Sequence, residues 1–436
     1  MANKWQEISI TKLLIGEKTT LENGLTVCLI PNTNFKEAHA MFTTRYGSNI
    51  NRFINPQTNE WYNAPEGVAH FLEHKLFDQP DGSDVFLAFS KIGASANAYT
   101  SHTQTSYIFS TNQNVEVATE ILLDYVQTPF FTEESVNKEK GIIEQEIKMY
   151  DDQFNWVGYR MALAQAYPNH PVGIDIAGTV ESIYAITPED LYTCYQTFYH
   201  PSNMQIILCG NFDLAVIKKV ISDNQNQKTY NNQAKIIIDK KSDCDAPVTK
   251  AVRKSIDAQT NYVTVIYKDI CKAQENKHPI YQELVVDIIL DMLFSDVSAY
   301  YSEFIDQNLV DTGISFYSNY EENYGYLLTQ VKSKKPSEFI EKYKSSWYEG
   351  TMMTREQFNR VKKLQIGTIL QSEANLQHIM TDVSRGLIDD ITPIIIFEWL
   401  EKISFDEVIA KYQEIVSRLD DYLTFVLLEG KISTEK

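Results

Sequence analysis

The pattern of apolar and polar positions predicts a β-rich beginning followed by helices. Residues 18–31 read as a hairpin, because Asn23-Gly24 is a strong turn signal between apolar runs. Residues 38–47 alternate roughly and predict another strand, while the apolar run 204–210 predicts a buried one. Helical spacing is found in three further stretches, at 84–93, 115–128 and 132–150. The pattern therefore predicts an α+β protein.

The second half of the chain repeats the order of elements found in the first half. The strand-like stretch 260–267 corresponds to 38–46, and the apolar helix 284–294 corresponds to 67–77. Four further correspondences are 313–318 with 93–100, 325–328 with 107–109, 354–358 with 132–136, and 422–428 with 204–209. We therefore expect two homologous halves, each a mostly antiparallel sheet backed by helices.

A polar stretch at roughly 222–250 separates the two halves and predicts an interdomain linker. With 436 residues the chain is too long for one ordinary core and suits two domains. We expect a first domain at 1–225, a linker at 226–248 with one short strand at 236–238, and a second domain at 249–436.

One stretch of the first half carries residues suited to metal chemistry. His70 and His74 are four residues apart and Glu73 follows His70 by three, so a helix places them on one face. Two neutral imidazoles at this spacing can bind one Zn²⁺, and the carboxylate beside them can accept a proton from water. The order His-x-x-Glu-His is an inverted zinc-peptidase motif. The alternative is two histidines on a helix surface, because short motifs also arise by chance.

A zinc site with two histidines needs a third protein ligand, usually a histidine or a carboxylate. The predicted helix 132–150 places Glu139 and Glu146 two turns apart on one face, with Ile142 and Ile143 between them. We interpret Glu146 as the third ligand and Glu139 as a supporting acid that holds a ligand or a substrate group. A solvated acidic helix face, which would include Glu144, is the alternative.

The stretch after the second predicted helix has small side chains and predicts a thin strand. A thin strand beside a catalytic helix offers an edge to which an extended peptide can pair through backbone hydrogen bonds. Ala96, Asn97, Ala98 and Tyr99 are the substrate-binding candidates on this strand. His102, close to the same strand, is a further candidate for substrate contact. An ordinary hairpin of the sheet is the alternative.

The metal motif is not repeated in the second half. His70, Glu73 and His74 align with Asp287, Leu290 and Asp291, and Glu139 and Glu146 align with Val361 and Thr368. We therefore expect a catalytic zinc-binding first domain and a homologous non-catalytic second domain that closes a chamber over the first.

Net charge, apolar runs and cysteine content limit the binding partners and the cellular compartment that we expect for this protein. The net charge of −19 disfavours nucleic acid and anionic membranes as partners and mildly favours basic peptides. No run of 18 apolar residues exists and the first residues lack an apolar segment, so we expect neither a membrane span nor a signal peptide. The 5 cysteines have no Cys-x-x-Cys spacing, which suggests reduced thiols in a cytoplasmic protein.

These segments together resemble the insulinase-like (M16, or pitrilysin-type) family of zinc metallopeptidases, in its short bacterial form. The resemblance covers essentially the whole chain. It rests on the zinc motif at 70–77, the glutamate segment at 139–147, residues 97–100 with Tyr107, and the segments 176–183 and 199–204.

The resemblance implies that His70, His74 and Glu146 ligate zinc, that Glu73 is the general base and that Glu139 supports them. It further implies that an unfolded peptide is held between two homologous halves, or between two half-size subunits, and pairs with a sheet edge. The expected function is a zinc-dependent endopeptidase that cleaves short unfolded peptides. A dedicated processor of one secreted signalling or antimicrobial peptide and a general peptide scavenger both fit this activity, and the sequence does not separate them. The alternative is a non-catalytic peptide-binding or scaffold subunit of the same family.

One feature departs from the family pattern. Active members present an Arg and a Tyr, seven residues apart, from a C-terminal half to the scissile carbonyl. This chain has no Arg between Arg253 and Arg355, so its own second half cannot supply that pair. We therefore expect a heterodimer with a zinc-less homologue that carries the Arg and the Tyr, with a homodimer as the alternative.

Overall fold

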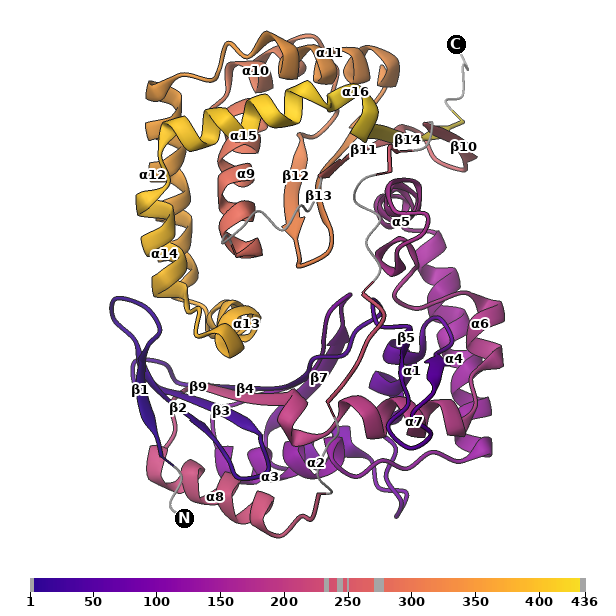
Figure 1. Ribbon diagram of the computed structural model, residues 1–436, viewed down its shortest axis with the longest axis vertical. Helices are drawn as coiled ribbons and strands as arrows, with labels where there is room; N and C mark the ends of the chain where they lie inside the picture. The colour runs from indigo at the N-terminus through magenta and orange to yellow at the C-terminus, as the bar shows by residue number, and fades with distance from the viewer. Residues whose placement is uncertain (1–3, 231–234, 241–245, 249–250, 270–277, 432–436) are drawn as a thin grey trace. The chain divides into compact units, whose positions relative to one another are not determined.

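The computed structural model describes residues 4–230, 235–240, 246–248, 251–269 and 278–431 (Figure 1). The chain forms two compact units, and each unit combines separate parts of the sequence. Unit 1 comprises residues 1–147, 175–239 and 371–395, and unit 2 comprises residues 148–174, 240–370 and 396–436. Two consecutive domains were expected from the sequence, whereas the segments 148–174 and 371–395 each join the unit of the other half.

Unit 1 is built on a seven-stranded sheet with the order β1-β2-β3-β9-β4-β8-β7. Strands β3 and β9 are parallel, and the other neighbouring strands are antiparallel. The predicted turn at Asn23-Gly24 joins β2 to β3, with Thr20 paired to Thr26. The strands are β1 (Gln6–Ser9), β2 (Ile15–Thr20), β3 (Thr26–Pro31), β4 (Ala38–Thr44), β7 (Ala94–Thr100), β8 (Thr105–Thr111) and β9 (Met204–Gly210), and a separate hairpin contains β5 (Arg52–Ile54) and β6 (Trp61–Asn63).

Helices cover both faces of this sheet. Helices α1, α2 and α3 contact β7 and β8 on one face, and α13 contacts β4 and β9 on the other (Figure 1). The helices of unit 1 are α1 (Val68–Lys75), α2 (Val85–Lys91), α3 (Val115–Val126), α4 (Glu133–Asp151, which runs into unit 2), α6 (Val180–Ala185), α7 (Pro188–Phe198), α8 (Leu214–Asn226) and α13 (Leu376–Gly386), with short 3₁₀ turns at Pro201–Asn203 and Leu387–Asp389.

The alternation of side chains along each strand produces two apolar clusters. Val27 and Leu29 of β3 face the cluster with α1 and α3, whereas Cys28 and Ile30 face the cluster with α13. Both faces of the central strands are therefore buried, which explains the consecutive apolar residues 206–209 of β9.

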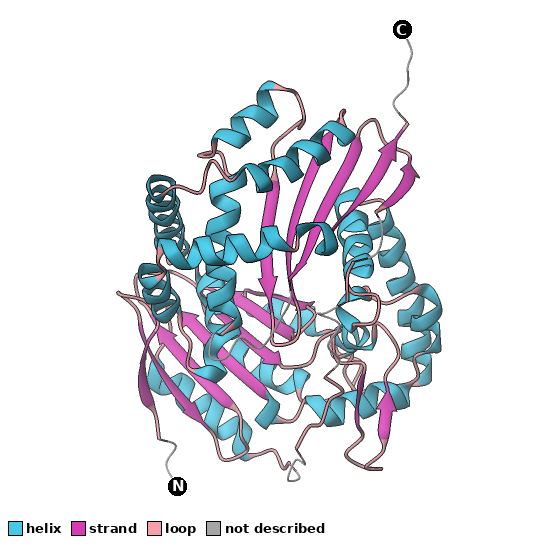
Figure 2. Ribbon diagram, turned by 45° about the horizontal axis from the view of Figure 1, so that its top comes forward, coloured by secondary structure: helices cyan, strands magenta, loops and turns pink. Residues whose placement is uncertain are grey.

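Unit 2 repeats the topology of unit 1, with the strand order β10-β14-β11-β13-β12. Two separate sheets, each with helices packed on it, are visible in Figure 2. The first pair, β10 and β14, is parallel and the other pairs are antiparallel, as in β3-β9-β4-β8-β7. The repeat predicted from the sequence is confirmed: β11 corresponds to β4, α9 to α1 and α12 to α4. The strands are β10 (Val252–Ile256), β11 (Asn261–Asp269), β12 (Ser315–Tyr320), β13 (Gly325–Ser333) and β14 (Leu423–Gly430).

Helices also cover both faces of the second sheet. Helix α5 packs on β11 and β14, and α9 packs on β12. The two helices belong to different apolar clusters, one on each face of the sheet. The helices are α5 (Phe154–Ala166), α9 (Pro279–Phe294), α10 (Ala299–Asp306), α11 (Pro336–Glu349), α12 (Arg355–Ser372), α14 (Pro393–Lys402, which begins in unit 1), α15 (Phe405–Ser417) and α16 (Leu419–Tyr422), with a 3₁₀ turn at Pro171–Gly173.

Residues 237–239 of the predicted linker lie along the β5 strand. Ile238 forms a bridge with Phe53, and the Asp239 amide donates to the Arg52 carbonyl over 2.9 Å. The strand expected at 236–238 is therefore reduced to a single bridge.

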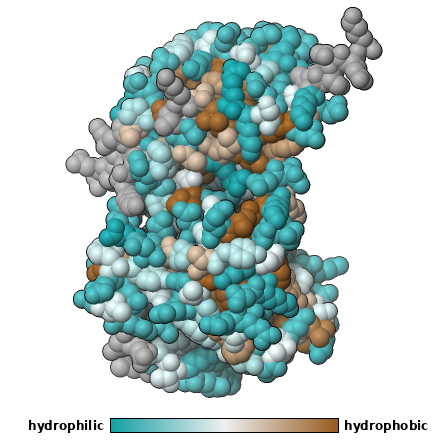
Figure 3. Space-filling model, turned by 90° about the vertical axis from the view of Figure 1, so that its right-hand side faces the viewer, coloured by the Kyte–Doolittle hydropathy of each residue, from teal (hydrophilic) through white to brown (hydrophobic). Residues whose placement is uncertain are grey.

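Three cysteines can be described, and Cys28, Cys194 and Cys209 are free thiols, as expected. Cys244 and Cys271 lie outside the described residues. Within the described ranges, no helix combines the length and the apolar character that crossing a membrane requires. One face of the protein is mostly hydrophilic, with small scattered hydrophobic areas (Figure 3).

Candidate active site

The zinc motif lies on α1, and a second segment fixes where this helix begins. Gly67, at the helix start, has φ 84°, and a Cβ there would lie 2.4 Å from the Ala177 carbonyl oxygen. Gly178 has φ 75°, and a Cβ there would lie 2.7 Å from the Glu66 carbonyl oxygen. The Ser182 hydroxyl donates to that same carbonyl over 2.9 Å. The segment 177–182 therefore holds the start of α1 by close backbone packing that only glycine permits.

The structure brings three of the predicted residues into one metal group, His70 and His74 of α1 and Glu146 of α4. Their ligand atoms lie within 4.8 Å of one another. The Glu146 Oε2 atom is 3.4 Å from His74 Nε2 and 3.7 Å from His70 Nε2. A tetrahedral zinc with bonds of about 2.1 Å separates its ligand atoms by about 3.4 Å, so the donor types and their spacing fit zinc.

Glu139 contacts His74 on the ring nitrogen that faces away from the other two members of the metal group. Its Oε1 atom is 2.9 Å from His74 Nδ1, and its side chain is 13% exposed. A carboxylate at Nδ1 orients the imidazole and leaves Nε2 for the metal, which is the usual arrangement around zinc-binding histidines. The Nδ1 atom of His70 is buried and has no such partner among the described residues. The two histidines are therefore supported unequally.

We expect Glu139→Gln to weaken zinc binding by about 10- to 100-fold, because an amide orients the His74 ring less strongly than a carboxylate does. Competition with a chromogenic chelator measures the dissociation constant. Glu144→Gln is the matched control, since Glu144 lies on the same helix but accepts a hydrogen bond from Tyr184 over 2.7 Å. Equal zinc affinity in the two variants would remove Glu139 from the support of the metal group.

The two imidazoles differ in protonation before a metal binds. Burial, together with the neighbouring His74, lowers the pKa of His70 to about 4. Burial also acts to lower the pKa of His74, but hydrogen bonds to Glu139 and Glu146 outweigh it and raise that pKa to about 10. His74 thus carries a proton near neutral pH, and a binding metal must displace it.

Glu73 lies one residue before His74, on the same helix, and is 8% exposed. Its Oε2 atom accepts a hydrogen bond of 2.6 Å from the Thr100 hydroxyl. Burial raises the pKa of Glu73, whereas the Thr100 hydroxyl and His74 oppose that rise. A buried carboxylate with a raised pKa beside a metal group has the properties that proton transfer requires.

The four substrate-binding candidates lie on β7, which is the last strand of the unit 1 sheet. The side chains of Ala96 and Ala98 pack on the face that carries α1. Those of Asn97 and Tyr99 alternate to the other face, where the Tyr99 hydroxyl is 3.9 Å from Met41 Sδ. Small side chains therefore face the metal group, and the tyrosine ring points away from it.

Two further residues lie close to the substrate-binding candidates. Thr100, which the sequence did not single out as a functional residue, contacts Glu73 directly. Its position directly after the substrate-binding candidates was the signal that could have identified it. His102 pairs through Nδ1 with the Ser48 hydroxyl over 2.9 Å.

The unit 2 positions that correspond to His70 and His74 hold carboxylates, and each accepts a hydrogen bond from a neutral side chain. Asp287 Oδ1 accepts from the Ser318 hydroxyl over 2.7 Å, and Asp291 Oδ2 accepts from the Gln365 amide over 2.8 Å. Burial, followed by repulsion from Glu283, raises the pKa of Asp287 to about 8. Among the described residues, His70, His74 and Glu146 form the one group of three or more His, Cys, Asp or Glu side chains close enough to hold a metal ion, and unit 2 has no such group.

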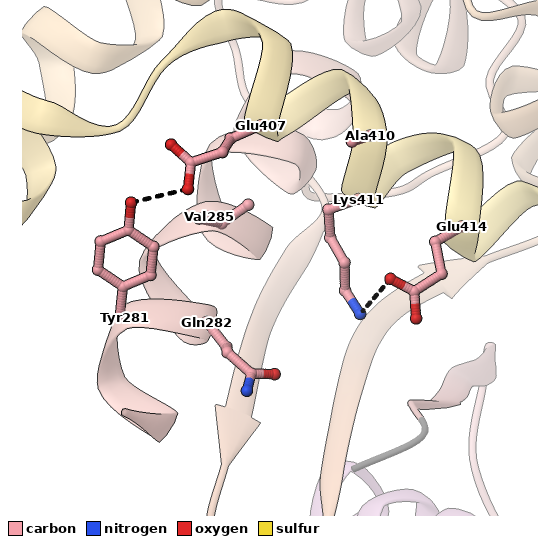
Figure 4. Close-up of a pocket in the computed structure, with 7 residues that line it drawn as sticks. All are labelled: Tyr281, Gln282, Val285, Glu407, Ala410, Lys411 and Glu414. Atoms are coloured by element: carbon pink, nitrogen blue, oxygen red, sulfur yellow. Dashed lines mark hydrogen bonds and ion pairs between the residues drawn. The ribbon is translucent and has the colours of Figure 1, made fainter. Parts of the chain in front are cut away.

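Unit 2 also contains a pocket of about 180 Å³ between α9 and α15 (Figure 4). Its charged groups bond within the protein, because Tyr281 donates to Glu407 over 2.9 Å and Lys411 lies 3.4 Å from Glu414. Lys411 also pairs with the buried Asp269 over 2.7 Å. We interpret these contacts as structural. The pocket lining is Tyr281, Gln282, Val285, Glu407, Ala410, Lys411 and Glu414.

Solved structures share this fold. An M16-like peptidase from Alicyclobacillus acidocaldarius superimposes with a TM-score of 0.91 and 33% identity, covering 97% of this chain and 100% of that chain. A protease from Helicobacter pylori superimposes with a TM-score of 0.80 over 97% of this chain and 100% of that chain, but at 17% identity it shows the fold alone.

Related sequences agree with the structural comparison. The uncharacterized zinc protease YmfH of Bacillus subtilis is 39% identical over 398 residues, covering 91% of this chain and 93% of the relative. The mitochondrial-processing peptidase subunit beta of Blastocladiella emersonii is 31% identical over 212 residues, which are 47% of this chain and 43% of the relative.

Family models match both halves of the chain. The model for insulinase (peptidase family M16) matches residues 60–180, which contain the whole metal group. The model for the peptidase M16 inactive domain matches residues 185–365. With its inverted motif, its His-His-Glu metal group and its duplicated sheet, the chain belongs to the insulinase family of M16 zinc peptidases.

Proposed function

We propose that this protein is a zinc-dependent endopeptidase that cleaves short unfolded peptides and processes a secreted signalling or antimicrobial peptide. One observation carries the proposal: the buried carboxylate of Glu73 lies on the same helix as two of the three members of the metal group. A non-catalytic family member has no need of a buried, hydrogen-bonded base beside a full set of ligands.

Each residue has a distinct task in the proposed reaction. His70, His74 and Glu146 would hold the zinc, and Glu139 holds the His74 ring in the orientation that would bind it. Zinc bound there would lower the pKa of a water molecule to about 7 and would polarise the carbonyl of the scissile peptide bond. Glu73 accepts a proton from the attacking water and donates it to the leaving amine when the C–N bond breaks.

The substrate is proposed to bind as an additional strand on β7. Strand β7 is the edge strand of its sheet, and backbone hydrogen bonds at such an edge accept many peptide sequences. Ala96, Asn97, Ala98 and Tyr99 are the proposed contacts. The net charge of −19 favours basic peptides.

A partner subunit is proposed to complete the active site. The charge that develops on the scissile carbonyl oxygen needs a donor beyond the metal, and no Arg lies between Arg253 and Arg355 to supply one from the second half. A relative acts as a named subunit, subunit beta of the mitochondrial-processing peptidase. We therefore propose a heterodimer with a zinc-less homologue that carries an Arg and a Tyr, with a homodimer as the alternative.

The domain assignment and the compartment are also proposals. The first domain, 1–225, would be catalytic, and the second, 249–436, would be non-catalytic, with 226–248 as the linker. Free thiols at the described cysteines support a cytoplasmic location.

A cleavage assay with a quenched fluorescent peptide tests the function. We expect the zinc-loaded chain to cleave an unstructured basic peptide weakly by itself and strongly with a zinc-less homologue, because the partner supplies the missing donors. A chelator should stop cleavage and added zinc should restore it. Full activity of the chain alone would contradict the heterodimer. Peptide binding without cleavage, even with the partner, would favour the scaffold alternative.

A further inference from the structure

Thr100 connects the end of the edge strand β7 to the carboxylate on α1. Its hydroxyl lies 2.6 Å from Glu73 Oε2 and 3.3 Å from the Thr105 hydroxyl. Thr105 in turn donates to the Tyr46 carbonyl oxygen over 2.9 Å. Three groups from separate elements thus form a line of polar contacts that ends at Glu73.

The direction of these hydrogen bonds follows from the number of protons. Each hydroxyl carries one hydrogen, and a carbonyl oxygen can only accept. The Thr105 hydroxyl therefore donates its hydrogen to the Tyr46 carbonyl oxygen, and the Thr100 hydroxyl donates its hydrogen to the Glu73 carboxylate. Among the described residues, Thr100 is the one hydrogen-bond partner of the Glu73 carboxylate.

The Thr100 hydroxyl is held rigidly. Thr100 pairs with Thr105 across the β7–β8 ladder, so its backbone is fixed by a neighbouring strand. A β-branched side chain has few accessible rotamers, so the hydroxyl has little freedom to turn away. A hydrogen bond from a rigid donor to a charged acceptor is both strong and directional.

We propose that Thr100 is a positioning residue for Glu73. Its hydroxyl holds Oε2 and leaves Oε1 as the oxygen that accepts the proton from the attacking water and returns it to the leaving nitrogen. The inference rests on the proposed function of Glu73 as the general base. Because β7 is also the proposed peptide-binding edge, the base and the bound peptide share one rigid frame, and the distance between them is fixed by the strand itself.

Thr100→Val removes the hydroxyl and keeps the shape. We expect kcat to fall by about 10- to 100-fold with KM and zinc content unchanged, because a small displacement of a catalytic group costs this much. Thr100→Ser should restore most of kcat. In the Glu73→Gln background the valine substitution should cause no further loss, since there is no base left to position. Crystal structures of both variants should show Glu73 displaced in the valine variant and in place in the serine variant.

Ser110→Ala is the matched control, because it removes a hydroxyl from β8 that bonds Ser95 over 2.9 Å on the exposed side. An unchanged kcat in Thr100→Val, or an unmoved Glu73 in its crystal structure, would overturn the proposal. A parallel loss of zinc, or a serine variant as slow as the valine variant, would also do so. If the wild type with its partner cleaves no peptide, the proposed function fails, whereas the position of Glu73 still decides the role of Thr100.

Discussion

Glu73→Gln is expected to abolish peptide cleavage while the chain still binds one zinc per molecule. The amide cannot accept the proton of the attacking water, and general base catalysis contributes about 10²- to 10⁴-fold to rates of this kind. The substitution leaves the metal group intact, because Glu73 is not one of its three members. The glutamine oxygen can also still accept the Thr100 hydrogen bond. The measurement is the cleavage rate with the partner present, together with zinc content by mass spectrometry.

Glu144→Gln is a suitable control for this experiment, because it makes the same chemical change on α4 at a position bonded to Tyr184. Its cleavage rate should equal that of the wild type. Peptidase activity retained in Glu73→Gln would refute the general-base assignment. Loss of zinc in that variant would instead place Glu73 among the ligands.

His70→Ala is expected to remove the zinc altogether, and cleavage with it. His70 is one of three protein ligands, is 8% exposed and lies 3.7 Å from the Glu146 carboxylate. Without it the metal would keep two protein ligands, fewer than the three that catalytic zinc sites use. A ligand that binds only the folded state stabilises it, so zinc should raise the melting temperature of the wild type and leave that of the variant unchanged.

Dialysis followed by metal analysis gives the stoichiometry directly, with one zinc expected for the wild type and none for the variant. His39→Ala serves as the control, because His39 lies on β4 and pairs with Glu37 over 3.1 Å. It should retain its zinc. A His70→Ala variant that still binds one zinc tightly would show that the metal is held by other residues.

The repeat and the zinc motif were open to prediction because both depend on local periodicity. Helical spacing alone places His70 and His74 on one face, and the same spacing on α4 indicated Glu139 and Glu146 together. The different tasks of the two glutamates were a matter of interpretation, since a helix face does not reveal which residue lies nearer a distant histidine. The structure separates them: Glu146 lies at the Nε2 atoms, and Glu139 at Nδ1 of His74.

Local periodicity could not predict which segments of the chain make up each of the two units. An amphipathic pattern states that a face is buried but not which surface covers it. The apolar face of α13 is evident in Leu376, Ile379, Met380 and Val383, yet the sheet that it covers belongs to the other half of the sequence. The contact between Thr100 and Glu73 was missed for a related reason, because it depends on how a helix lies against a strand 27 positions further along the chain.

The packing of α13 affects how the protein forms on the ribosome. Strand β9 is complete at Gly210, but α13 begins only at Leu376. At about 5–20 residues per second, synthesis takes about 10–30 s to cover this interval. For that time one face of the first sheet, with Cys28, Met41 and Ile207, has no helix to cover it. The nascent chain therefore exposes this apolar face until α13 has been synthesised, and an exposed apolar sheet face makes such an intermediate prone to aggregation.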